Sequence, residues 1–489
     1  MTPSNKNKSH IPTKVGVMIL AAGLGKRMKS SLPKVLHEIG GKPLIFHILH
    51  QVQKSIPHAS VAVIVGHGKE QVERRIRESG EFNQLDLHFV HQAEQRGTGH
   101  AARCAMDSKW GEAQVSAKSS VLILPGDTPL MTAEMVAQIA QPLQKNEALR
   151  LLTTEIANPT GYGRVVRRGK KGPVIRITEE KDANTREKEI KEIAVSIYLF
   201  QATFLKSFLQ RLSNKNAQGE YYLTDLVAQA ARNKKRCDVL MWAESNDLRG
   251  INNPWELSQA REILNERVIR KWALQGVTFI SPQNTYVDVD VELSEDVKIQ
   301  PGAILRGKTK IARGTQIGPN VVLSDMQVGE GAEIKAGTVG DHSSVAAGAA
   351  VGPYAHLRPD SHVGSEAKIG NFVELKKSRI GAKTSIAHLS YVGDAEVGAH
   401  VNIGCGFVTC NFDGRVINGE RKHKTIIEDD VFLGSDCQAI APIRIGKGAY
   451  VASGSTLTDD VEAGALAIAR SRQVTKPGYA KKLKPEGSK

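Results

Sequence analysis

The sequence predicts two folds in one chain, a mostly parallel, Rossmann-like α/β domain and a left-handed parallel β-helix of hexapeptide repeats, joined by a linker helix. In the first half, short apolar runs alternate with segments of helical periodicity. From Pro254 to Gly276 the chain keeps helical spacing and mixed charge. After that stretch an aliphatic residue returns at every sixth position. These observations place the domain boundaries at 1–253, 254–277 and 278–489.

Strand and helix signals alternate through the first domain. The apolar runs Val15–Leu20, Val61–Val65 and Ser120–Asp127 each end in a turn signal, and helical spacing marks Pro43–Lys54 and Thr132–Leu143. This alternation predicts a sheet that helices cover on both faces. Ligands of such sheets bind beyond the carboxyl ends of the strands, so functional residues are expected directly after the apolar runs.

The six-residue period in the last domain predicts a coil with three flat sides. Each side takes six residues, its aliphatic residue points inward, and small residues turn the corners. An ordinary β-sandwich would instead alternate every second residue. Two stretches break the period, 372–379 and the longer polar segment 407–425. The inward positions are Ile311, Ile317, Leu323, Val339, Val345, Val351, Leu357, Val363, Ile369, Ile380, Ile386 and Val392.

Composition narrows the class of partner. The formal net charge is +15, but no basic stripe with interleaved aromatic residues indicates nucleic-acid binding, and no amphipathic basic helix indicates a membrane surface. Small polyanions such as nucleotides, sugar phosphates or coenzyme A fit this charge best. The five cysteines form no C-x-x-C pair, and neither a signal peptide nor a long apolar span is visible. We therefore expect a cytoplasmic protein without a membrane span, and its basic tail from Arg470 onward is either functional or merely solubilising.

A glycine-rich turn, Gly23 to Met28, directly follows the first apolar run. It lacks the pattern of a Walker A loop and the third glycine of a dinucleotide fingerprint. Backbone N–H groups in such a turn can approach phosphates, and Arg27 adds a charged fork. The longer string LAAGLGKRMKSSLPKVLHEIGGKPLI is more specific, and it supplies a second cation, Lys34.

That string resembles the sugar-nucleotide pyrophosphorylase family. With the hexapeptide domain, the chain resembles the bacterial bifunctional members that also carry an acetyltransferase. The resemblance implies acetylation of glucosamine-1-phosphate by acetyl-CoA and uridylyl transfer from UTP to the acetylated sugar phosphate. It spans nearly the whole chain. Further matching strings are HQAEQRGTGHA (91–101), PGDTPL (125–130), GYGR (161–164), EEKDA (179–183), NAQGEYYLTD (216–225) and GINN (250–253).

The resemblance also implies roles for residues of the first domain. Asp127 and Asn252 would hold Mg²⁺, a hard cation that prefers oxygen ligands. Positioning and charge cancellation dominate such transfers, so no protein nucleophile is expected. The nucleotide and phosphate site would comprise Leu20, Ala21, Ala22, Gly23, Arg27, Lys34, Gln92, Gly97 and Thr98, and the sugar site Gly163 and Glu179.

Three positions of the first domain depart from the family pattern. The family motif E-x-N-[TS]-G reads here Glu192 to Ser196, so Ala194 replaces a sugar-binding Asn and Ser196 replaces Gly. Pro125 stands where the family usually has Tyr. Because Ala cannot form a hydrogen bond, about 0.5–1.5 kcal/mol of sugar binding would be lost. We expect uridylyl transfer with weakened or altered sugar recognition.

The last domain keeps more of the pattern, and the resemblance implies that His388 is the general base of acetyl transfer. A neutral His suits this role at physiological pH. Glu374 and Asn411 would orient His388 or the substrate amine, and Lys422 would close over the site. Arg358, Lys376, Tyr391 and Asn402 would bind the sugar phosphate, and Cys405, Asn411, Phe412, Ser435, Ser453 and Arg470 would bind acetyl-CoA.

The last domain has departures of its own. Phe412 replaces a Tyr, Cys405 and Ser453 replace Ala, and the loop before Lys422 is longer than usual. Other hypotheses remain open: an acetyltransferase with an impaired first domain, a nucleotidyltransferase with a structural β-helix, or a non-catalytic subunit. The resemblance further implies a homotrimer that acts on small molecules.

Overall fold

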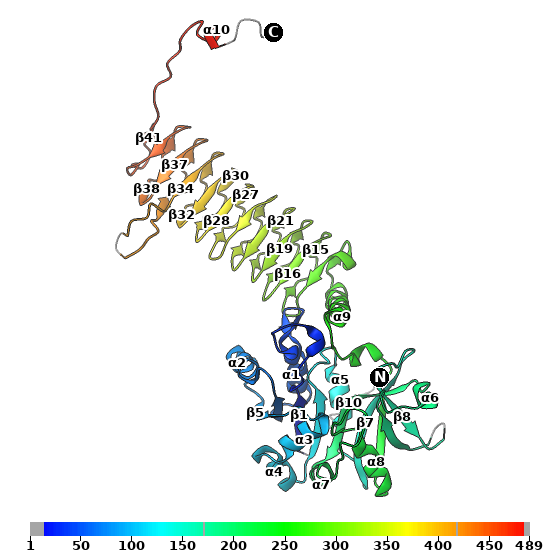
Figure 1. The fold of residues 1–489 in the computed structure, drawn as a ribbon. Coiled ribbons are helices and arrows are strands. Elements are labelled where there is room, and N and C mark those ends of the chain that lie inside the picture. The colour runs from blue at the N-terminus through cyan, green and yellow to red at the C-terminus, as the bar shows by residue number, and fades with distance from the viewer. Residues whose placement is uncertain (1–13, 170–171, 417–418, 484–489) are drawn as a thin grey trace, which may run out of the picture. The chain divides into compact units, whose positions relative to one another are not determined.

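The computed structural model describes residues 14–169, 172–416 and 419–483. It divides into two compact units between Leu264 and Asn265, within helix α9 (Pro254–Ala273) (Figure 1). Each unit has hydrophobic cores of its own. The first 13 residues and the end of the basic tail, 484–489, lie outside the described residues.

The first unit contains one mixed sheet in the order β11-β7-β10-β6-β1-β4-β5. The pairs that β1 forms with β4 and β6 are parallel, as is the pair β4–β5, whereas β10 runs antiparallel to β6 and β7. The strands are β1 (Val15–Leu20), β4 (Ser60–Val65), β5 (Asp86–His91), β6 (Ser120–Pro125), β7 (Glu147–Glu155), β10 (Glu192–Gln201) and β11 (Arg236–Met241), with β8 (Gly163–Arg167) and β9 (Val174–Thr178) beside β10 and the small hairpin β2 (Glu38–Ile39) and β3 (Lys42–Pro43) apart.

Helices cover both faces of this sheet, as predicted. Residues of α1, α2 and α5 join the core on one face, and residues of α3, α4, α7 and α8 join the core on the other. Helix α5 is shorter than the predicted Thr132–Leu143, because the Thr132 side chain caps its start and the chain turns before Pro142. The helices are α1 (Leu44–Ser55), α2 (Lys69–Ser79), α3 (Thr98–Met106), α4 (Lys109–Ser116), α5 (Ala133–Ile139), α6 (Thr185–Lys188), α7 (Ala202–Leu209) and α8 (Asp225–Arg232).

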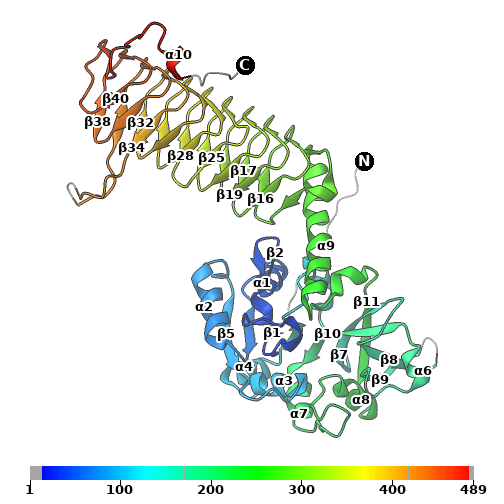
Figure 2. The ribbon, with the colours of Figure 1, turned by 45° about the horizontal axis from the view of Figure 1, so that its top comes forward.

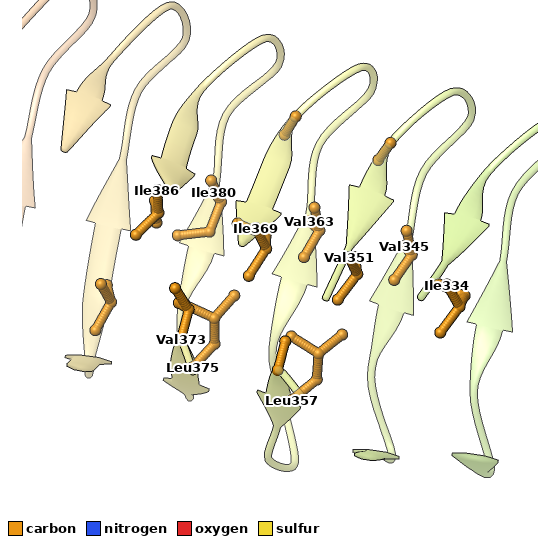
Figure 3. Close-up of a cluster of buried hydrophobic side chains, with 14 of the residues drawn as sticks. Ile334, Val345, Val351, Leu357, Val363, Ile369, Val373, Leu375, Ile380 and Ile386 are labelled. Atoms are coloured by element: carbon orange, nitrogen blue, oxygen red, sulfur yellow. The ribbon is translucent and has the colours of Figure 1, made fainter. Parts of the chain in front are cut away.

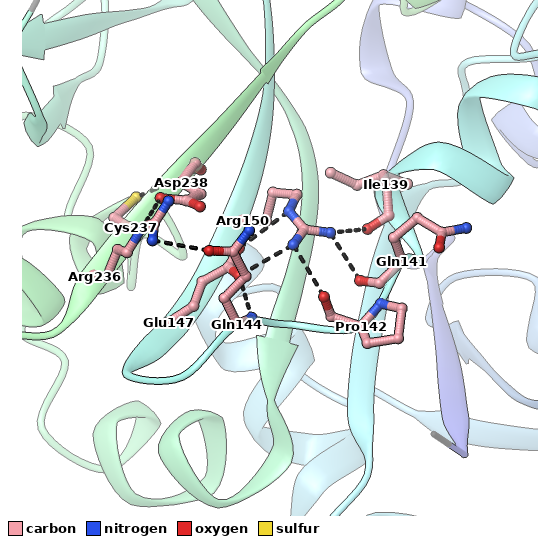
Figure 4. A network of polar contacts seen from close by, with 9 residues as sticks. All are labelled: Ile139, Gln141, Pro142, Gln144, Glu147, Arg150, Arg236, Cys237 and Asp238. Atoms are coloured by element: carbon pink, nitrogen blue, oxygen red, sulfur yellow. Dashed lines mark hydrogen bonds and ion pairs between the residues drawn. The ribbon is translucent and has the colours of Figure 1, made fainter. Parts of the chain in front are cut away.

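A buried ion pair fixes the connection from α5 to β7 (Figure 4). Glu147 is fully buried and pairs with the Arg150 guanidinium at 3.0 Å. The same guanidinium donates to three backbone carbonyls at the end of α5, including that of Gln141 at 2.8 Å. The ion pair and these hydrogen bonds give partners to the Arg150 guanidinium, whose positive charge would otherwise be costly to bury. Arg150 therefore has a structural role.

The second unit is a left-handed parallel β-helix with three flat faces (Figure 2). The first face consists of β12 (Thr278–Phe279), β15 (Lys298–Ile299), β18 (Gln316–Ile317), β21 (Glu333–Ile334), β24 (Ala350–Val351), β27 (Lys368–Asn371), β30 (Ser385–His388), β33 (Asn402–Ile403), β36 (Phe432–Leu433), β39 (Tyr450–Val451) and β41 (Leu466–Ala467). The second face consists of β13 (Tyr286–Val287), β16 (Ile304–Arg306), β19 (Val322–Ser324), β22 (Val339–Asp341), β25 (His356–Leu357), β28 (Glu374–Lys376), β31 (Tyr391–Gly393), β34 (Val408–Cys410), β37 (Gln438–Ile440) and β40 (Thr456–Leu457). The third face consists of β14 (Glu292–Leu293), β17 (Lys310–Ile311), β20 (Gln327–Val328), β23 (Ser344–Val345), β26 (His362–Val363), β29 (Arg379–Ile380), β32 (Ala395–Val397), β35 (Thr425–Ile427) and β38 (Ile443–Ile445). A short helix, α10 (Ala480–Leu483), lies near the end of the described chain.

Aliphatic side chains stack inside the coil in the positions that the period predicts (Figure 3). Val339 is the exception, since its side chain is 40% exposed. In that coil the buried position of β22 belongs to Gly340. A side chain at Gly340 would come within 3.0 Å of the buried Met326 thioether, so Met326 fills the space that Val339 was expected to fill.

The corners of the coil also differ from the prediction that small residues turn them. Tyr354, Phe372 and Leu389 adopt positive φ angles of 54°, 56° and 42° at corners of the coil. Their side chains are exposed, and the rings of Tyr354 and Phe372 stack with centroids 5.8 Å apart. The stacking contributes favourable contacts where the left-handed backbone costs about 1–2 kcal/mol per residue.

Candidate active sites

The glycine-rich turn lies at the carboxyl ends of β1 and β6, where ligands bind in such sheets. The backbone N–H of Gly126 donates to the Leu20 carbonyl at 2.8 Å, which holds the ends of these strands together. Gly25 has a φ of 60°, and a side chain there would clash with Lys34 at 2.9 Å. The turn therefore packs directly against the short 3₁₀ helix (Lys34–Leu36) that carries Lys34. Ala21 and Ala22 are buried beneath it, and Gly23 has no neighbour that a side chain would meet.

Two cations meet two oxygen ligands at this edge. The Lys34 ammonium forms an ion pair with the Asp127 carboxylate and lies 3.5 Å from the Asn252 amide oxygen. The Arg27 guanidinium donates to the same amide oxygen at 2.9 Å. The backbone N–H of Ile251 donates to the Asp127 carbonyl at 2.9 Å, which brings these distant segments together. The structure thus places all four predicted residues in one cluster.

The oxygens of Asp127 and Asn252 suit a divalent cation. Mg²⁺ is commonly held by one or two protein oxygens while substrate phosphates and water complete its shell. Within the described residues, no group of three or more His, Cys, Asp or Glu is placed to hold a metal. Two protein oxygens are a donor set that fits Mg²⁺ bound together with a phosphate ligand.

The three residues expected to read the base also lie together, between β5 and α3. Gln92 is buried, and its amide donates to the Gly97 carbonyl at 3.2 Å. Gly97 has a φ of 101° and lies so close to the Tyr221 backbone that no side chain would fit. The Thr98 hydroxyl accepts from the Leu223 N–H at 3.1 Å. These contacts tie the turn to the backbone of Tyr221 and Leu223.

Gly163 and Glu179 face one another across β8 and β9. A Cβ at Gly163 would meet Ile177 at 2.8 Å and the Glu179 carboxylate at 3.5 Å. Glu179 accepts a hydrogen bond from the Thr224 hydroxyl at 2.9 Å. Burial raises the pKa of the Glu179 carboxyl, although the hydrogen bond from Thr224 lowers it. The nearby Asp225 carboxylate raises this pKa further. The two residues expected to bind the sugar therefore lie side by side.

The departures at Ala194 and Ser196 fall beside that pair. Ala194 is buried in β10 and stands opposite both Gly163 and Thr153 in the sheet register. The Thr153 hydroxyl is buried, and no described group forms a hydrogen bond with it. Ser196 has a φ of 58° within an irregularity of β10, which is the backbone that Gly adopts at least cost. The Thr153 hydroxyl, without a described partner, thus stands beside a residue that has no polar side chain.

In the second unit, His388 ends β30 and is exposed. Its Nδ1 lies 2.7 Å from the Oδ1 of Asn371, which stands directly opposite in β27. In the neutral ring this contact places the proton on Nδ1, because the amide oxygen can only accept, and leaves Nε2 as the nitrogen that can take up a proton. Asn371 was not predicted from the sequence, although its place one coil before His388 in a regular repeat could have revealed it.

The residues expected to orient His388 or the substrate amine, Glu374 and Asn411, form hydrogen bonds and ion pairs with other groups. Glu374 forms an ion pair with Arg358 at 2.9 Å. Asn411 is buried, and its amide donates to the Asp394 carboxylate at 2.5 Å and to the Tyr391 hydroxyl at 3.4 Å. In the described part of the chain, no hydrogen bond joins either Glu374 or Asn411 to His388. Their contacts instead fix the polar second face, where Lys376 and Tyr391 stand in adjacent coils.

Four of the residues expected to bind acetyl-CoA follow successive coils, namely Cys405, Ser435, Ser453 and Arg470. The backbone N–H of Ser435 donates to the Ser453 hydroxyl at 3.1 Å, and the carbonyl of Cys405 accepts from the residue after Ser435 at 2.7 Å. Arg470 lies beside Gly454, with its Cδ 3.7 Å from where a side chain would begin. Asn402 precedes this row on β33 and is exposed. The row thus consists of three small side chains, and Arg470 places one cation at its end.

The longer loop ends beside Phe412. The Lys422 ammonium lies 4.1 Å from the centre of the exposed Phe412 ring, a cation–π contact. Asp413 bonds to Arg415 and to the buried His423, whose imidazole lies 3.3 Å away. The hydrogen bonds from Arg415 hold the pKa of Asp413 at about 2, so the Asp413 carboxylate stays ionised over the physiological range. Residues 417–418 lie outside the described part of the loop.

None of the described helices is both long and apolar enough to cross a membrane. Residues 17–169 match the MobA-like NTP transferase domain family. Three similar curated proteins bear the name bifunctional protein GlmU. The one from Trichlorobacter lovleyi is 42% identical over 96% of this chain and 99% of its own length. Those from Shouchella clausii and Pelobacter propionicus are 42% and 43% identical, over 95% and 96% of this chain and 98% and 99% of their own lengths. With this identity over both units, the chain belongs to the family of bifunctional GlmU proteins.

Proposed function

We propose that this chain makes UDP-N-acetylglucosamine in two steps. The second unit transfers the acetyl group of acetyl-CoA to the amine of glucosamine-1-phosphate, so that an amide forms, the thioester breaks and coenzyme A leaves as the thiol. The first unit then joins the phosphate of that product to the α-phosphorus of UTP and releases pyrophosphate. The observation that carries this proposal is family membership across both units at once.

The cation cluster supports the nucleotidyl step. Arg27 and Lys34 lie where they can neutralise phosphate charge, and the backbone of the glycine-rich turn is open to an anion. Asp127 and Asn252 would hold Mg²⁺, which supplies further charge neutralisation when it is bound. Beside the buried Gly163, the half-buried Glu179 carboxylate would give the sugar its acceptor. The fixed turn around Gln92, Gly97 and Thr98 would bind uracil.

The pair His388–Asn371 supports the acetyl step. Nε2 of His388 takes the proton that the amine loses when it attacks the thioester carbon. The sugar phosphate is bound by Arg358, Lys376, Tyr391 and Asn402, and the coenzyme by the row from Cys405 to Arg470. Lys422 and Phe412 stand at the loop that borders the site. As part of the proposal, the active chain is a homotrimer that works in the cytoplasm.

The test is to assay both steps on one purified preparation. We expect pyrophosphate release with UTP, Mg²⁺ and N-acetylglucosamine-1-phosphate, and thiol release with acetyl-CoA and glucosamine-1-phosphate. Thiol release without pyrophosphate release would leave an acetyltransferase alone. Pyrophosphate release without thiol release would reduce the β-helix to a structural role. Absence of both would refute the proposal.

One observation favours a variant of this function. The Ala194 side chain cannot form a hydrogen bond with the sugar. The hydroxyl of its neighbour Thr153 has no described hydrogen-bond partner. Selectivity for the acetylated sugar would then be weaker than the proposal requires. Comparing kcat/KM for N-acetylglucosamine-1-phosphate and glucose-1-phosphate distinguishes the two functions, because equal values would indicate a relaxed sugar site.

A further inference from the structure

The Asn252 side chain has two chemically opposite ends, and the cluster accepts only one orientation. Its oxygen accepts a hydrogen bond from the Arg27 guanidinium at 2.9 Å and lies 3.5 Å from the Lys34 ammonium. If the amide were turned around, its N–H₂ group would face two cations, and its oxygen would face the Glu256 carboxylate. Both contacts would be repulsive, and the oxygen expected to ligate the divalent cation would point away from the site.

Glu256 fixes this orientation from behind. One carboxylate oxygen accepts from the Asn252 backbone N–H at 2.8 Å and from its side-chain N–H₂ at 3.2 Å. The other oxygen accepts from the Asn253 side chain at 2.7 Å. The Glu256 backbone N–H in turn donates to the Asn253 side-chain oxygen at 2.9 Å, so the first turn of α9 holds the carboxylate in place.

Helix α9 is itself anchored beside the cluster. Leu257 and Ala260 pack in a buried group with Met28 of the glycine-rich turn and with Ile251, the residue before Asn252. The position of Glu256 is therefore set by packing and not by the charged groups that it serves. Such a partner behind a ligand fixes both its rotamer and its donor–acceptor orientation.

We propose that Glu256 is a positioning residue for nucleotidyl transfer, because it holds the Asn252 oxygen toward Arg27, Lys34 and the divalent cation. The inference rests on the proposed function of the first unit. Glu256 also contributes one negative charge near two cations, so a test must separate orientation from charge. Gln keeps one acceptor oxygen and removes the charge, whereas Met keeps the length and removes both.

The experiment compares full-length Glu256→Gln and Glu256→Met with Glu262→Met, a matched control at an exposed position on the same helix. We expect Glu256→Met to weaken Mn²⁺ binding in the presence of UTP, measured by electron paramagnetic resonance, by about tenfold or more. The Mg²⁺ concentration for half-maximal pyrophosphate release should rise by a similar factor. Glu256→Gln should stay within about threefold of wild type for both readouts.

Acetyl transfer by each variant and its melting temperature report whether the protein folds. Unchanged Mn²⁺ binding in Glu256→Met would overturn the proposal. Equal loss in Glu256→Gln and Glu256→Met would also overturn it, because charge and not orientation would then matter. If the wild type releases no pyrophosphate, the proposed function fails, while the Mn²⁺ measurement still decides the role of Glu256.

Discussion

At the scale of single residues, the hydrogen bond between His388 and Asn371 decides which ring nitrogen can accept a proton. Asn371→Ala removes the acceptor that holds the proton on Nδ1, so both tautomers become populated and the ring loses its fixed orientation. We expect kcat for acetyl transfer to fall about ten- to a hundredfold, less than the roughly 10²–10⁴-fold that a general base itself contributes, because His388 stays in place. Thiol release at saturating substrate measures this, and pyrophosphate release by the same preparation is the control. An unchanged kcat would mean that the bond has no part in orienting His388.

A second residue-scale prediction concerns Ala194. Ala194→Asn places an amide beside the unpartnered Thr153 hydroxyl and the Gly163 backbone. One additional hydrogen bond is worth about 0.5–1.5 kcal/mol, so KM for N-acetylglucosamine-1-phosphate should fall about two- to twelvefold. KM for UTP is the internal control and should not change. If KM for the sugar phosphate stays the same or rises, Ala194 does not account for the sugar recognition of this chain.

At the scale of elements, helix α1 carries a buried His47 whose Nε2 lies 3.0 Å from the Ile39 carbonyl. Burial lowers the pKa of His47 below its usual 6.5, so the folded protein binds fewer protons than the unfolded chain. Its contribution to stability is therefore present above pH 6.5 and declines as the pH falls below that value. Differential scanning calorimetry of His47→Gln should show a smaller loss of melting temperature between pH 7 and pH 5.5 than wild type. The exposed His67→Gln serves as control and should keep the wild-type slope.

The elements also show what the sequence could predict. Alternation and the six-residue period predicted the order of strands and helices because burial imposes those periods. The inward place of Val339 was predicted wrongly, since Met326 reaches in from a corner and no periodic rule describes such a substitution. The cluster of Arg27, Asp127 and Asn252 followed from family motifs. Glu256 lies beyond the motif GINN (250–253). Its role depends on which end of the Asn252 amide it faces, and the sequence does not give that orientation.

At the scale of the whole molecule, the chain consists of two compact units, each with one candidate site. Within the described residues, the first cluster and the His388 pair draw on separate units. A substitution in one cluster should therefore leave the other activity unchanged, which is why each activity can serve as control for the other.

The proposed trimer makes the two activities respond differently to dilution. If neighbouring coils complete the acetyltransferase site, dissociation removes part of each site, whereas the nucleotidyl cluster stays whole within one chain. We expect the specific activity of thiol release to fall as the protein is diluted below the dissociation constant of the assembly. The specific activity of pyrophosphate release should stay constant over the same range. Light scattering at each concentration measures the assembly directly. If the trimer dissociates while both activities persist, one β-helix carries a complete acetyltransferase site.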